Sequence, residues 1–83
     1  MTEQELMDHI MRLGAGCYRE VRVLKDGCIV GIGNMMFTRA IYMDMHADGW
    51  GKRFCFEDRA LADAEYKKLQ SEDDEPVGWI ARR

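Results

Sequence analysis

Residues 43–55, MDMHADGWGKRFC, hold side chains that could bind a metal ion. Two carboxylates, an imidazole and a thiol are present: Asp44, Asp48, His46 and Cys55. These are donor types that zinc and other transition metals take in proteins. A small metal- or thiol-dependent enzyme could use Asp44, His46 and Cys55. A metal site needs three or four converging ligands. Whether these side chains can converge depends on the secondary-structure elements that position them.

Those elements favour a hairpin. Asp48 and Gly49 form a dipeptide typical of a two-residue β-turn, with alternating strand-like residues on both sides. The cross-strand pairs that this loop predicts are Ile41 with Phe56, Met43 with Phe54, and Asp44 with Arg53. Two pairs then share an apolar face and the third joins opposite charges. The hairpin is therefore the stronger interpretation, and it leaves His46 near the tip.

An earlier hairpin is predicted over residues 18–34. Asp26 and Gly27 form its turn, again as a two-residue loop. The β-branched pairs that follow are Val23 with Val30 and Val21 with Ile32. Both pairs then lie on one face of the sheet.

A helix is expected after Thr2, which can cap it with Glu5 in a capping box. Leu6, Ile10 and Leu13 form its apolar stripe. Gly14 and Gly16 follow the stripe and can end the helix.

A second helix is expected over residues 57–72, capped by Asp58 or Glu57. Its apolar arc contains Leu61, Ala62, Tyr66 and Leu69. Glu65 falls inside this arc, so we expect its stem to pack while its carboxylate reaches water or an arginine.

An acidic loop and a final strand, VGWIARR, close the chain, with Trp79 expected to be buried. Residues 1–83 therefore predict one α+β domain in the order α-β-β-β-β-α-β. We expect an antiparallel meander with both helices on one face.

Three cysteines, an odd number without a C-x-x-C pair, indicate reduced thiols. The N-terminus lacks the apolar region of a signal peptide, and no apolar run is long enough to span a membrane. We expect a cytoplasmic protein that requires no cofactor.

The net charge is only −3, but residues 57–75 hold eight acids against three bases. An acidic segment favours a partner with a basic surface and disfavours direct binding of nucleic acid. Exposed methionines and aromatics are typical of adaptable protein contacts, as expected for Trp50 at the hairpin tip. For the connection at residues 35–37, two interpretations stay open: an exposed contact surface, or methionines that fill gaps in the core. The candidate partner-binding residues are Met36, Phe37, Trp50, Glu57, Asp58, Asp63, Glu72, Asp73, Asp74 and Glu75.

The segment KRFCFEDRALADAEYKKLQ, followed by an acidic gap and GWIARR, resembles short proteins of phages and mobile elements, of which the anti-CRISPR proteins are a group. The resemblance covers about the last 30 residues in style. It implies a small protein that blocks a host nucleic-acid-binding machine by occupying a basic surface.

We therefore expect a non-enzymatic protein-binding inhibitor or regulator. The alternatives are the metal or thiol enzyme above, and a nucleic-acid-binding sheet that uses Arg19, Arg22, Arg39 and Arg53. A further alternative is a homodimer in which the first or the last strand pairs edge to edge with a second copy.

Overall fold

The computed structural model describes residues 2–13, 18–35 and 37–82. Its elements are α1 Glu3–Leu13, β1 Tyr18–Val23, β2 Ile29–Asn34, β3 Arg39–His46, β4 Gly49–Phe56, α2 Arg59–Lys68 and β5 Ala81–Arg82. The predictions made for Gly14, Gly16 and Met36 lie outside the described residues, as do Cys17, one of the three cysteines expected to be reduced, and the side chain of Leu13.

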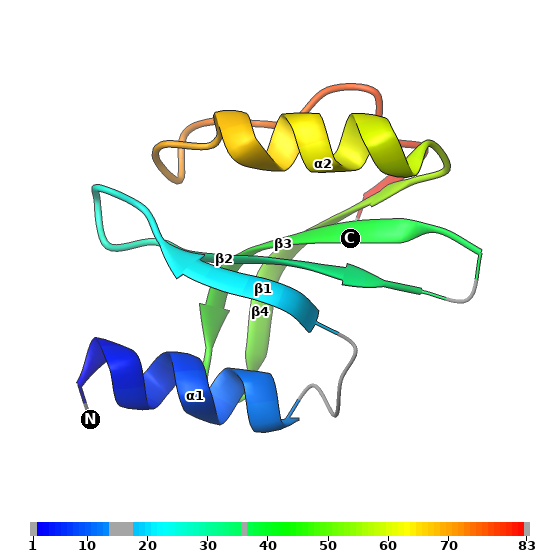
Figure 1. Ribbon diagram of the computed structural model, residues 1–83. Helices are drawn as coiled ribbons and strands as arrows, with labels where there is room; N and C mark the ends of the chain where they lie inside the picture. The colour runs from blue at the N-terminus through cyan, green and yellow to red at the C-terminus, as the bar shows by residue number, and fades with distance from the viewer. Residues whose placement is uncertain (1, 14–17, 36, 83) are drawn as a thin grey trace.

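The five strands form one antiparallel sheet in the order β1-β2-β3-β4-β5. The α+β class, the element order and the meander are therefore confirmed. The two helices, however, lie on opposite faces, with α2 above the sheet and α1 below it in Figure 1. The prediction that both helices cover one face is wrong. β1 and β5 are the two edges of the sheet.

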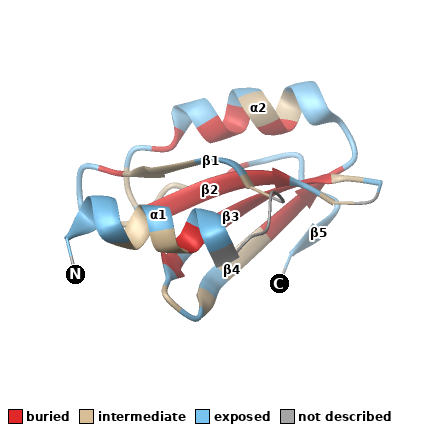
Figure 2. Cartoon of the chain, turned by 60° about the horizontal axis from the view of Figure 1, so that its bottom comes forward, coloured by how far each residue is buried: buried red, intermediate tan, exposed pale blue. Residues whose placement is uncertain are grey.

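Each helix buries a separate hydrophobic cluster against the sheet, as the red strands between the two helices in Figure 2 show. The cluster under α2 contains Leu24, Val30, Ile32, Ile41, Met43, Phe54, Phe56, Ala62, Tyr66 and Leu69. The cluster over α1 contains Ile10, Ile29, Ala40, Tyr42, Met45 and Cys55. Strands β2 and β3 are buried on both faces, which explains why alternation alone did not indicate a second covered face.

The first hairpin has a three-residue loop, not the predicted two-residue loop. The Leu24 amide donates to the Cys28 carbonyl (2.8 Å), and Gly27 takes the left-handed conformation with φ +88°. This geometry is typical of a type I turn followed by a left-handed residue. Each predicted pair shifts by one residue, so Val23 lies opposite Ile29.

A one-residue shift in register turns each side chain of a strand to the opposite face of the sheet. The predicted shared face of this hairpin is therefore wrong. Val30 and Ile32 pack under α2, whereas Val21 and Val23 pack on the α1 side. Glu20 and Arg22 now lie opposite Ile32 and Val30.

The second hairpin is confirmed, but its register differs by two residues. His46 lies opposite Gly49, so Ala47 and Asp48 form the loop. The observed partners are Ile41 with Phe54, Tyr42 with Arg53 and Met43 with Lys52. A two-residue shift keeps each side chain on its face, and Ile41, Met43, Phe54 and Phe56 share one cluster as predicted. The predicted pair of Asp44 with Arg53 is not formed.

Both helix N-termini are capped as expected. The Glu5 amide donates to the Thr2 hydroxyl, and the Thr2 amide donates to the Glu5 carboxylate, which completes the capping box. Asp58 accepts from the Leu61 amide and caps α2. Leu6 and Ile10 of the predicted stripe pack on the α1 cluster.

Glu65 is buried, with 5% of its surface exposed. Its carboxylate accepts from Lys68 Nζ (2.8 Å) and from the Val77 amide (2.9 Å). Its partners are thus a lysine and the backbone, not the expected water or arginine. The bond to Val77 ties the C-terminal segment to α2.

The final strand is shorter than predicted and comprises two residues. Ala81 pairs with Cys55 and Arg82 with Phe54. Trp79 lies against Phe54 with ring centroids 6.0 Å apart and remains 38% exposed, so the expectation that it is buried is wrong. The positive φ of Gly78 (+87°) interrupts the extended backbone just before it.

Candidate functional site

Trp50, at the start of β4, is a partly exposed aromatic side chain held in a fixed position. It is 38% exposed, and its ring meets Tyr42 edge-on with centroids 5.1 Å apart. Tyr42 in turn meets Tyr18 edge-on at 5.0 Å, and the Arg53 guanidinium lies 5.4 Å from the Trp50 ring centroid. The aromatic contacts and the cation–π contact restrict the orientation of the indole.

An irregularity in β3 brings Trp50 to the α1 face. Asp44 has φ +56°, so Met43 packs under α2 while Met45, two residues on, packs over α1. Met45 is paired with Trp50. Gly51 leaves room for the Asp44 carboxylate, since a Cβ there would lie 2.5 Å from Asp44 Oδ2. Asp44 therefore has a structural role at the tip.

A small hollow of about 160 Å³ lies beside Trp50. It is lined by Ile10, Tyr18, His46, Asp48, Gly49 and Trp50. His46 is oriented by the Asp48 amide, which donates to its Nδ1 at 3.2 Å. An internal cavity of about 150 Å³ accommodates a benzene ring, so this hollow has the size for one inserted side chain.

Some of the predicted acids lie beside the same hairpin. Residues 71–75, named here the acidic loop, contain Glu72, Asp73 and Glu75, which line one hollow with Lys52 and Arg82. Glu72 is held through its amide, which donates to Asp26 at 2.8 Å. Glu75 pairs with Arg82 at 3.4 Å. This loop therefore presents acids close to β4, with part of their charge offset.

The other predicted acids have structural roles or lie elsewhere. Both carboxylate oxygens of Asp63 accept from Arg39 Nη1, at 2.7 and 2.8 Å. Asp74 accepts from the amides of residues 70 and 71 and shapes the acidic loop. Glu57 and Asp58 precede α2, at the sheet end away from the Trp50 hairpin. The structure thus divides the predicted acidic surface between the two ends of α2.

Phe37 is the most exposed large apolar residue described, at 82%. It lies in the β2–β3 connection, separated from Trp50 by the eight residues of β3, or about 25 Å of strand. Phe37 and Trp50 therefore belong to different surfaces. Met35, next to the connection, packs on the α1 cluster.

The residues of the predicted metal or thiol chemistry do not converge. His46 pairs with Gly49 at the tip, whereas Cys55 pairs with Ala40 six residues down β3, about 20 Å away. Within residues 2–13, 18–35 and 37–82, no group of three His, Cys, Asp or Glu side chains could hold a metal ion.

Three of the four arginines considered for nucleic-acid binding have internal partners. Arg22 donates to the carbonyls of Tyr66 and Leu69 at the C-terminal end of α2. Arg39 is buried against Asp63, and Arg53 lies over Trp50.

The residues that support Trp50 were not predicted from the sequence. Tyr18, Tyr42 and Arg53 form its surroundings, and Arg53 Nε is buried without a hydrogen-bond partner among the described residues. The available signal was Tyr42, an aromatic out of phase with Ile41 and Met43 and thus directed to the other face.

Comparison with protein-family models, curated proteins and solved structures finds no match to this chain. Among the described helices, neither is long and apolar enough to cross a membrane.

Proposed function

We propose that this chain is a binding protein that inhibits or regulates a larger protein partner through the β3–β4 hairpin. The proposal rests on one observation: Trp50 is partly exposed, yet its ring is held by contacts with Tyr42 and Arg53. Tryptophan, tyrosine and arginine dominate the energetics of protein interfaces. A side chain already fixed in place loses little conformational entropy on binding.

The partner surface that fits best is basic and carries one side chain that enters the hollow beside Trp50. The exposed acids Glu72 and Asp73 support this choice, since opposite charge accelerates and orients association. An inhibitor of the anti-CRISPR kind, acting on a basic nucleic-acid-binding surface in the cytoplasm, is the specific form of this proposal. The free thiols of Cys28 and Cys55 agree with a reducing compartment.

The test of the charge requirement is affinity capture by the tagged full chain from lysate of its own cell or that cell's bacterial host, at low and high salt. We expect one enriched protein with a basic surface, released by salt. The double variant Glu72→Lys, Asp73→Lys should capture less of it and show a weaker salt dependence. Glu57→Lys, at the other end of α2, is the matched control. If the double variant captured as much of the partner as the Glu57→Lys control, the role of the acidic loop would be contradicted.

A further inference from the structure

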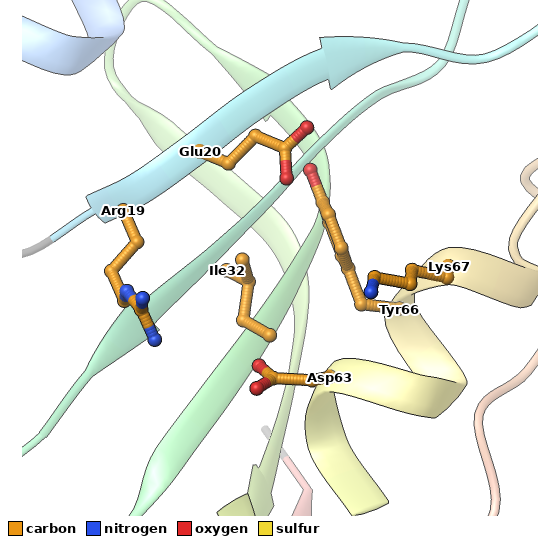
Figure 3. Close-up of a pocket in the computed structure, with 6 residues that line it drawn as sticks. All are labelled: Arg19, Glu20, Ile32, Asp63, Tyr66 and Lys67. Carbon is orange, nitrogen blue, oxygen red and sulfur yellow. The ribbon is translucent and has the colours of Figure 1, made fainter. Parts of the chain in front are cut away.

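A second hollow, of about 250 Å³, lies on the opposite face of the sheet between β1 and α2. Figure 3 shows its lining side chains, which come from β1, β2 and α2: Arg19, Glu20, Ile32, Asp63, Tyr66 and Lys67. The volume is slightly below the 300–1,000 Å³ typical of pockets for larger ligands. Only a small ligand fits.

The Tyr66 hydroxyl gives this hollow an unmet need for a hydrogen-bond acceptor. Tyr66 is only 3% exposed, and its hydroxyl has no hydrogen-bond partner among the described residues. Burial, and then the Glu20 carboxylate, raise the pKa of Tyr66 to about 12, so the phenol remains a donor at neutral pH. Buried hydroxyls without a partner are uncommon, and each one calls for an explanation such as a functional role or a bound water or ion.

The charged side chains around the hollow are also unpaired. No described residue forms an ion pair with Arg19, Glu20 or Lys67. Asp63 differs, because both of its carboxylate oxygens accept from Arg39. The rim therefore offers two free positive charges, one free negative charge and one buried donor.

We propose that this hollow binds a small zwitterion of the α-amino-acid class. Its carboxylate would accept from the Tyr66 hydroxyl and pair with Arg19 and Lys67, and its ammonium group would pair with Glu20. In Figure 3 the Glu20 carboxylate lies beside the Tyr66 hydroxyl. The proposed pose therefore requires Glu20 to turn from the hydroxyl toward the ammonium group of the ligand. Ile32 provides apolar contact for the ligand's side chain.

A zwitterion fits better than a simple ion because both signs of charge face the hollow. A plain anion would meet Glu20, and a plain cation would meet Arg19 and Lys67. The site is independent of Trp50, which lies on the other face of the sheet.

The test is an NMR titration of the ¹⁵N-labelled full chain with the standard amino acids, each up to about 10 mM, a range that detects millimolar dissociation constants. We expect saturable shifts of the backbone amides at Arg19, Ile32 and Lys67 for a subset of them. For leucine, the matched analogues are isopentylamine, which lacks the carboxylate, and 4-methylpentanoate, which lacks the ammonium group. Each analogue of a binding amino acid should bind at least about tenfold more weakly.

The key variant is Tyr66→Phe, which keeps the ring and removes the hydroxyl. We expect binding to weaken about tenfold while the thermal midpoint stays equal or rises, because an unpaired buried hydroxyl is lost. Lys67→Ala should also weaken binding, and Lys25→Ala, an exposed lysine outside the hollow, should not. Absence of saturable shifts, unchanged affinity of Tyr66→Phe, or equal binding of the analogues would each overturn the proposal.

Discussion

At the residue scale, Glu65 shows how a buried acid is retained in an apolar arc. Its carboxylate is stabilised by the Lys68 ammonium group and then by the Val77 amide, which together hold the pKa of Glu65 below its ordinary 4.5. A lowered pKa means that the folded state favours the ionised form. The resulting stabilisation is present above pH 4.5 and is lost as the pH falls through the folded-state pKa.

Glu65→Gln should therefore flatten the decrease in unfolding free energy below pH 4.5. At neutral pH it should cost about 1 kcal/mol, because a neutral amide accepts a weaker hydrogen bond from Val77. Urea unfolding of both proteins between neutral pH and pH 3 measures both effects. An unchanged pH slope would show that Glu65 is not the group responsible.

Gly78 and Gly27 form a matched pair for a second prediction. Both have φ near +90°, at +87° and +88°, but a Cβ at Gly78 would lie 2.5 Å from Leu61 Cδ2, whereas nothing lies within 4 Å of one at Gly27. Alanine at either position carries the left-handed penalty of about 1–2 kcal/mol. Gly78→Ala should therefore destabilise the fold more than Gly27→Ala. Equal losses in chemical denaturation would contradict the close contact with Leu61.

At the element scale, the Arg39 and Asp63 pair joins β3 to α2. Arg39 is buried, and its guanidinium also donates to Asn34 at 3.0 Å. Asp63→Ala would leave this buried cation with one neutral acceptor, and we expect a loss of about 2–3 kcal/mol. Asp73→Ala, an exposed acid without an ion pair among the described residues, is the control and should change stability little. Similar unfolding midpoints for both variants would refute the structural role of the pair.

Turn geometry limited what the sequence could predict about these elements. Asp-Gly marks both hairpins, yet Asp26 and Gly27 end a three-residue loop, and Gly49 is already the first residue of β4. The Asp26 carboxylate accepts from the Cys28 and Glu72 amides, a contact with the distant acidic loop that no local pattern contains. Capping residues were predicted correctly because capping is local. Strand register was not, because it also depends on distant contacts.

At the scale of the whole molecule, contacts between distant segments also explain why α1 was predicted on the wrong face of the sheet. Ala40, Tyr42 and Cys55 look like an outer face beside Ile41, Phe54 and Phe56, yet they are buried under α1. The predicted acidic surface likewise depended on where α2 places its two ends. The sequence indicated which residues suit an interface. The tertiary structure places Trp50 and the acidic loop beside the same hairpin but on opposite faces of the sheet, with Phe37 at the other end of β3.

Trp50 is proposed to anchor a protein partner. The most direct measurement is quantitative mass spectrometry of the proteins captured by the wild-type chain, by Trp50→Ala and by Phe37→Ala, each first shown to be folded. We predict one protein that wild type enriches, that Trp50→Ala captures at least about thirtyfold less strongly, as expected for an interface hot spot, and that Phe37→Ala retains. The claim is contradicted if no protein is enriched, or if Trp50→Ala captures the partner as well as wild type does.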